Sequence, residues 1–155
     1  FELEYVDSGN ERKQPIMLQR AIFGSIERIF GILIEQWAGR FPVWLAPLQV
    51  RTLSIADRHA PYAEQLVSRL QAAGIRADAD TSNERIAKKI RNAASEKAPY
   101  LLVVGDEEMA NGTVAVRGRG TGQEDTDHGS MPFEAFLAKV REEATAHMRN
   151  AADPT

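Results

Sequence analysis

A glycine, a serine and an arginine stand together at the start of a predicted helix. The stretch GSIER contributes Gly24, Ser25 and Arg28, with Glu27 between the last two. Free amides at a helix N-terminus and a guanidinium both bind phosphate, so this spacing could hold a nucleotide. The alternative is a surface ion pair between Glu27 and Arg28, which contributes little to stability. These residues alone leave both readings open.

A second group of candidate residues is cationic. The stretch NERIAKKIRN carries four basic residues and one acidic residue, a local charge of +3 on a chain whose net charge is −3. Two more arginines follow in VRGRG. Such a cluster is more often a solvated helix face, and the alternative is contact with phosphates or bases, for which the arginine fork is suited. The residues are Arg85, Lys88, Lys89, Arg91, Arg117 and Arg119.

Other chemistry is poorly represented. No glycine-rich phosphate loop of either standard form occurs, and the chain has no cysteine. His59, His128 and His147 show no metal-ligand spacing and are expected to be exposed. The sequence therefore predicts no metal site and offers little to a free-standing enzyme.

Length and composition indicate one globular domain plus a remnant of another. The chain has 155 residues, 43% hydrophobic and 26% charged, without an apolar run long enough for a membrane span. Its net negative charge argues against indiscriminate nucleic-acid binding, and neither DNA nor a membrane is an expected partner. The chain begins at Phe1 without a recognisable signal peptide. We therefore expect a cytoplasmic protein, cut from a longer one.

The first part of the chain is expected to be a hairpin followed by a helix. Alternation in FELEYVD and the apolar stretch PIMLQR predict two strands. Apolar residues spaced by three and four predict a helix from about Ser25 to Gly39. The stretch GRFPVWLAP has two prolines and no periodicity, which places a domain boundary near Pro47. The predicted parts are residues 1–46, 47–150 and a frayed tail, 151–155.

From residue 48 onward, strands alternate with helices. LQVRTLSI, GIRADAD, PYLLVVG and NGTVAVRG are predicted strands, with a turn at Asn111-Gly112. Helices are predicted at 58–73, from a Thr81/Glu84 capping box to about Lys97, and from Pro132 to about Met148. RGTGQEDTDHGS is expected to be a mobile loop. The order predicts an α/β fold: a mixed, mostly parallel sheet with helices on both faces.

Four segments, in order, resemble the C-terminal part of bacterial threonyl-tRNA synthetases. The resemblance covers Phe1 to about Met148 and implies the end of a class II catalytic core followed by an anticodon-binding domain. The family's ligase uses ATP and magnesium, is a homodimer and binds tRNA. Since the other catalytic motifs precede this stretch in the family, the chain alone is expected to be inactive. The segments are RAIFGSIERIFGILIE, FPVWLAPLQV, GIRADADTSNERIAKKIRNA and PYLLVVGDEE…GTVAVR.

The resemblance also implies roles for individual residues. Gly24 and Ser25 would line the ATP site and Arg28 would meet its phosphates as a catalytic residue, with Glu27 a partner of Arg28 or a first-turn dipole residue. The family's zinc-ligand histidine is replaced by Gln19, a poor zinc ligand, so zinc is doubtful. The residues implied to meet the anticodon are Asn83, Arg85, Arg91, Glu108 and Arg117. Lys88 and Lys89 are expected to contact the RNA backbone or to serve solubility.

Two other functions compete with a synthetase fragment. A non-catalytic paralogue could use the anticodon-binding fold for protein interaction or regulation, and Gln19 favours that reading. An unrelated α/β module that binds a nucleotide is disfavoured by the missing glycine-rich loop.

Overall fold

The computed structural model describes residues 3–120 and 126–152. The chain forms two compact units, residues 1–32 and 33–155, and each is described by itself. Helix α1 (Ile26–Trp37) belongs to both. The domain boundary near Pro47 stays a prediction.

The first unit contains a short antiparallel hairpin, β1 (Tyr5–Val6) and β2 (Arg12–Lys13). Its turn is held by Asp7, whose carboxylate accepts the amide hydrogens of Gly9 (2.8 Å) and Glu11 (3.1 Å). The predicted second strand, PIMLQR, is wrong: residues 14–20 form no strand and are all exposed. A strand needs a hydrogen-bonded neighbour, and in the described part of this unit β1 pairs only with β2.

The helix expected after Ser25 is present as α1. It ends at Trp37, because Ala38 (φ 49°) and Gly39 (φ 74°) adopt left-handed conformations that close the last turn. The segment that follows, residues 38–46, is termed the linker.

The second unit is built on a five-stranded sheet in the order β4-β3-β5-β6-β7. Strand β3 is parallel to β4 and β5, whereas β6 and β7 are antiparallel. The predicted mixed sheet is confirmed, with its pairings divided evenly between the two directions. The strands are β3 (Val50–Ser54), β4 (Ala77–Asp80), β5 (Tyr100–Val104), β6 (Thr113–Gly118) and β7 (Thr126–Pro132).

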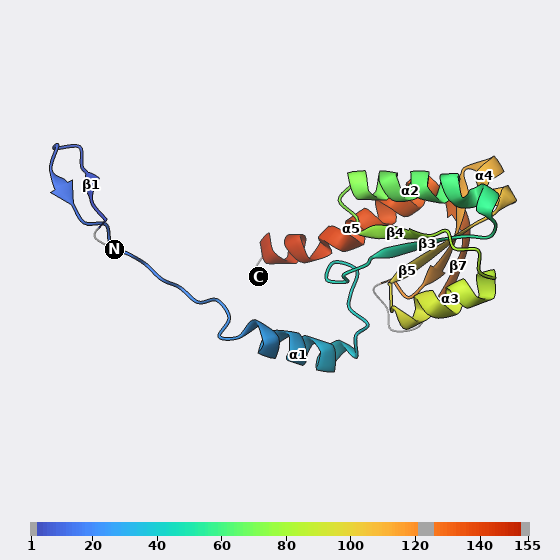
Figure 1. Cartoon of the computed structure of the whole chain (residues 1–155), viewed down its shortest axis with the longest axis horizontal. Helices are drawn as coiled ribbons and strands as arrows, with labels where there is room; N and C mark the ends of the chain where they lie inside the picture. Colours follow the sequence, from blue (N-terminus) through green and yellow to red (C-terminus); the bar gives the residue numbers. More distant parts are fainter. Residues whose placement is uncertain (1–2, 121–125, 153–155) are drawn as a thin grey trace. The chain divides into compact units, whose positions relative to one another are not determined.

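Helices cover both faces of this sheet, as predicted (Figure 1). Helices α2 (Ala60–Ala72) and α5 (Phe133–Ala152) pack on one face over the larger apolar core, which includes Leu70, Leu102 and Phe136. A 3₁₀ turn, η1 (Asp57–His59), precedes α2. Helix α3 (Ile86–Ser95) packs on the other face over a smaller core around Leu53 and Leu101.

Two elements were not expected from the sequence. Helix α4 (Asp106–Asn111) ends at the predicted Asn111-Gly112 turn, where Gly112 has φ 65°, and three acidic residues in its first turn stabilise its N-terminus. Strand β7 occupies part of the predicted mobile loop, whose residues 121–125 lie outside the described residues. Its polar side chains are mostly exposed, and backbone pairing with β6 is what makes it a strand.

Three predicted helix ends were misplaced. The Thr81/Glu84 capping box does not start α3, because Asp80 holds a turn at Ser82 and the helix begins at Ile86. Glu84 instead pairs with Lys88 at 2.7 Å. At the C-terminus, α5 begins at Phe133 and continues through residue 152, so part of the predicted frayed tail is helical.

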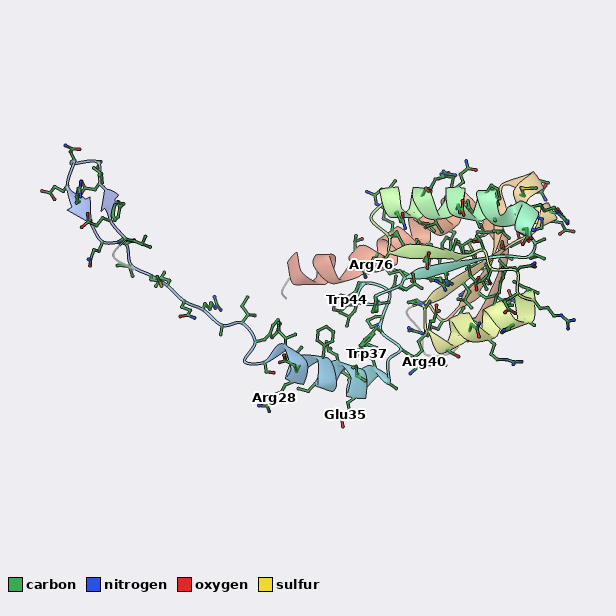
Figure 2. All side chains as sticks on the ribbon, in the orientation of Figure 1. Arg28, Glu35, Trp37, Arg40, Trp44 and Arg76 are labelled. Atoms are coloured by element: carbon green, nitrogen blue, oxygen red, sulfur yellow. The ribbon has the colours of Figure 1, made fainter. Side chains whose placement is uncertain are left out.

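The linker is held to the rest of the second unit through its backbone carbonyls. Lys97 Nζ donates to Ala38 O (2.6 Å), and Arg119 donates to Phe41 O (2.7 Å). Arg76 donates to Trp44 O (2.8 Å) and to the carbonyl of residue 46 (2.9 Å), and Figure 2 shows its side chain directed toward the linker. Charged donors therefore fix a segment that has no regular secondary structure.

Candidate nucleic-acid interface

Helix α3 and strand β6 carry exposed cationic side chains on the sheet face that α3 covers. Arg117 on β6 pairs across the sheet with Leu101 on β5, which packs in the core under α3. Residues paired across strands point to the same face, so Arg117 lies on the α3 side. Its side chain is 49% exposed and forms an ion pair of 3.3 Å with Asp127. Arg117 is therefore available to a ligand.

A pocket of about 330 Å³ lies beside Arg117. Its floor is apolar, formed by Ile90 and Ala94 of α3 with Ala98 and Leu101. Among the described residues, its rim carries four cationic side chains and one carboxylate, so the described lining is basic although the chain is acidic overall. The charged rim residues are Arg40, Lys97, Arg117, Arg119 and Asp127.

The two arginines of this pocket differ in what they contact. Arg119 is 6% exposed and donates to Phe41 O (2.7 Å) and Lys97 O (3.2 Å). Its guanidinium therefore joins the linker to the loop after α3, whereas Arg117 faces solvent. Counting basic residues in the sequence does not separate these two roles.

The predicted anticodon residues fall into two groups along α3. Arg117 lies near the amino end of β5, next to Leu101. Asn83 and Glu108 follow the carboxyl ends of β4 and β5, about 10 Å away along the strands at 3.3 Å per residue. Arg91 lies on α3 between these two groups and is exposed. It precedes the pocket residue Ala94 by three positions, so the two side chains are about 60° apart around the helix. Of the five predicted residues, only Arg117 lines the pocket.

Two of these residues have local structural contacts. Arg85 is the N-cap of α3, with an extended backbone and a carbonyl that accepts the amide hydrogens of Lys88 (2.8 Å) and Lys89 (3.1 Å). Glu108 accepts the amide hydrogen of Gly105 (3.0 Å) and so caps α4. The remaining carboxylate oxygen of Glu108 could still accept a bond from a base.

Lys89 is not the exposed residue that the sequence predicts. It is 2% exposed, and its ammonium donates to Ser54 O (2.9 Å), Ser54 Oγ (3.2 Å) and Asp80 O (3.1 Å). Although partial burial would raise the pKa of Asp80, hydrogen bonds from Ser82 and the charge of Lys89 hold that pKa below its usual value. The sequence did carry a signal: Lys89 is three residues after Ile86 and four before Ala93, on the apolar face.

His59 is also buried, contrary to the expectation of an exposed histidine. Its Nδ1 accepts the amide hydrogen of Ala56 (3.2 Å), so Nε2 carries the proton and donates to Asp106 (2.9 Å). Arg58 bonds the same carboxylate, and together these partners hold the pKa of Asp106 well below its usual range. The cluster joins η1 to the first residue of α4.

The predicted nucleotide residues lie in the first unit. Ser25 caps α1 by accepting the amide hydrogen of Arg28 (3.3 Å), and its hydroxyl donates to Glu27 (2.7 Å). This bond holds the pKa of Glu27 below its usual value, and Glu27 is engaged with Ser25 rather than Arg28. Arg28 is exposed at the first turn of the helix (Figure 2), and a guanidinium there fits a phosphate group. Gly24 has open space around it.

Metal and membrane sites receive no support from the described residues. Among the described side chains, those of residues 3–120 and 126–146, no group of three or more histidine, aspartate or glutamate residues could hold a metal ion. Gln19 is exposed in a segment without regular structure. None of the helices in the described part of the chain is long and apolar enough to cross a membrane.

Comparisons with known proteins agree on one family. The family described as anticodon binding domain matches residues 43–143. Threonine–tRNA ligases from Desulforamulus reducens and Burkholderia vietnamiensis are 50% and 53% identical over 92% and 90% of this chain. The chain spans only 22% and 21% of the length of these two relatives.

A solved structure extends the likeness to the fold. The RNA-binding domain of threonyl-tRNA synthetase from Cryptosporidium parvum is 29% identical, with a TM-score of 0.70 over 91% of this chain and 35% of that one. A threonyl-tRNA synthetase from Aeropyrum pernix, 22% identical with a TM-score of 0.63, supports the fold alone. The chain therefore is similar over most of its length to part of threonyl-tRNA synthetases, and it belongs to the anticodon-binding domain family.

Proposed function

We propose that this chain binds the anticodon arm of threonine tRNA as the C-terminal part of a threonine–tRNA ligase. The observation that carries the proposal is the basic pocket beside α3, with Arg117 exposed at its rim on an otherwise acidic chain. Anticodon bases are single-stranded, so they can leave the stack and present their edges and faces to side chains.

The candidate contacts extend along the whole of α3. Ten residues of helix measure about 15 Å at 1.5 Å per residue, a length that can accommodate several unstacked nucleotides. Asn83 and Glu108 offer an amide and a carboxylate that distinguish donors from acceptors on base edges. Arg85, Arg91 and Arg117 supply charge for phosphates and planar groups for stacking. These five residues are our proposed anticodon contacts.

The parent's chemistry is part of the same proposal. ATP with magnesium would activate the amino acid, with pyrophosphate as the leaving group, and in this chain Arg28 would hold phosphate oxygens beside the amides that follow Gly24 and Ser25. A guanidinium at that place would stabilise negative charge on the phosphates. We expect a cytoplasmic homodimeric parent, in which zinc is doubtful because of Gln19, and no aminoacylation by this chain alone.

The test is a binding titration with threonine tRNA transcripts that carry normal or altered anticodons, at two salt concentrations. Phosphate contacts should weaken binding at higher salt for every transcript. An altered anticodon base should weaken binding by a further 1–3 kcal/mol, on the order of one base contact. Equal affinity for all anticodons would overturn the proposed base recognition.

Replacing Arg117 with alanine should separate binding from stability. The exposed ion pair with Asp127 is worth about 0–1 kcal/mol, so the melting temperature should change little. Binding of the threonine tRNA should weaken by about 1–3 kcal/mol if Arg117 contacts a base. A large fall in melting temperature with unchanged affinity would show instead that Arg117 is structural.

The second candidate is a non-catalytic paralogue, and the observation that favours it is Gln19 in place of the family's zinc-binding histidine. Metal analysis and aminoacylation by the complete parent distinguish the two. An active parent would exclude the paralogue even without zinc.

A further inference from the structure

A buried ammonium group joins the carboxyl ends of two parallel strands. Ser54 and Asp80 are the last residues of β3 and β4, and Lys89 of α3 donates to the backbone carbonyls of both. The hydroxyl of Ser54 is within 3.2 Å of the same ammonium and donates to Asp80 O at 3.3 Å. Three N–H donors thus have three oxygen acceptors, and the group is satisfied without a carboxylate partner.

The strand end that Lys89 holds leads directly into the loop that carries Asn83 and Arg85. Beyond the carbonyl bound by Lys89, the carboxylate of Asp80 accepts both the amide hydrogen (3.0 Å) and the hydroxyl (2.6 Å) of Ser82. The loop ends at Arg85, whose carbonyl accepts the amide hydrogen of Lys89 itself. Lys89 therefore contacts the start of this loop through its side chain and the end through its backbone.

We propose that Lys89 is a positioning residue for anticodon recognition: it sets the conformation of the β4–α3 loop that presents Asn83 and Arg85. This inference rests on the proposed function. Lys89 makes no contact with RNA in this scheme, because its ammonium is enclosed and all three of its donors are used.

Lysine suits this place better than its substitutes. A methionine of similar length would leave two backbone carbonyls without their charged donor, which favours rearrangement of the strand ends. An arginine carries a planar fork with five donors, and this fork does not match three acceptors gathered around one point. Neither substitution should reproduce the native loop.

The experiment compares Lys89→Met with Lys88→Met in the 155-residue chain. Both remove one positive charge from the same helix, so the two variants have the same net charge. Lys88 is exposed and pairs with Glu84, which makes it a matched control. The measured quantity is the ratio of affinities for the threonine tRNA and for a transcript with an altered anticodon.

We expect Lys89→Met to reduce this ratio by about tenfold, the equivalent of one base contact, and Lys88→Met to leave it unchanged. Amide hydrogen exchange at Ser82, measured without RNA, should accelerate in Lys89→Met only. Ser54→Ala removes one of the three acceptors and provides a milder variant should Lys89→Met fail to fold; it should shift both measurements in the same direction.

The outcomes separate this inference from the proposed function. Suppose that the wild-type chain discriminates between anticodons and that Lys89→Met does so equally well, with unchanged exchange at Ser82. That result would overturn the positioning role and leave anticodon binding intact. A wild-type chain that does not discriminate would overturn the proposed function, and exchange at Ser82 would still decide whether Lys89 sets the loop. A lower melting temperature with an unchanged ratio would show that Lys89 is only structural.

Discussion

Replacing Gly118 with alanine is expected to lower the free energy of unfolding by about 3 kcal/mol or more, combining a backbone clash with an unfavourable dihedral angle. Gly118 ends β6 opposite Tyr100 with φ +133°. A Cβ there would lie 2.2 Å from the carbonyl oxygen of Pro99 and 3.0 Å from Tyr100 Cα. Because both neighbours are backbone atoms, neither can move aside without displacing β5. Urea denaturation monitored by circular dichroism measures the loss.

The control is Gly74→Ala. Gly74 also has a positive φ (+81°), but a Cβ added there would meet nothing within 4 Å. Its substitution should cost only the left-handed backbone penalty, about 1–2 kcal/mol. Equal losses in the two variants would contradict the close approach of β6 to β5 at Gly118.

Much of the sheet could be predicted from the sequence because its central strands are continuous or alternating apolar runs. PYLLVVG became β5, which is buried, and LQVRTLSI became β3. Strand β7 could not be predicted in the same way, since TDHGSMP is polar and owes its conformation to backbone pairing with β6. Helix α4 was hidden because an Asn-Gly pair is as typical of a turn as of a helix end.

The candidate site was predictable as a set of residue types but not as an arrangement. Charge indicated that the stretch from 83 to 92 and Arg117 could meet a polyanion. Charge did not indicate that Lys89 is enclosed, because most lysines are exposed. The position of Lys89 on the apolar face of the helix pointed the other way, but it was the weaker signal. Burial of His59 also depends on contacts far apart in sequence, from Ala56 to Asp106.

Arg117 and Arg119 show the limit of periodicity most directly. The two are separated by one residue, so an alternating strand would place both on the same exposed face. Both line the same pocket, but Arg119, which follows the positive φ of Gly118, is directed to the linker while Arg117 remains exposed. Sequence alone gives no measure of that φ.

Replacing Arg119 with methionine is therefore expected to lower the free energy of unfolding by about 3 kcal/mol, the scale of one or two hydrogen bonds from a charged donor. The guanidinium donates to Phe41 O and Lys97 O in a site where Arg119 is 6% exposed. Methionine keeps the apolar stem but removes the donors, which leaves the two carbonyls to find water. Thermal and urea denaturation measure the effect.

Arg117→Met is the matched control, since it removes the same charge two residues away at an exposed position and should cost no more than about 1 kcal/mol. Hydrogen exchange can then locate the change. Loss of the bond to Phe41 O should accelerate exchange at the Arg40 amide, which is bonded to Trp37 O. Arg76 and Gln49 still hold Val43, Trp44 and Ala46, so the amides of residues 45 and 46 should stay protected. Acceleration along the whole linker would mean that Arg119 maintains the fold of the unit rather than one contact, and unchanged exchange at Arg40 would mean that the linker does not depend on it.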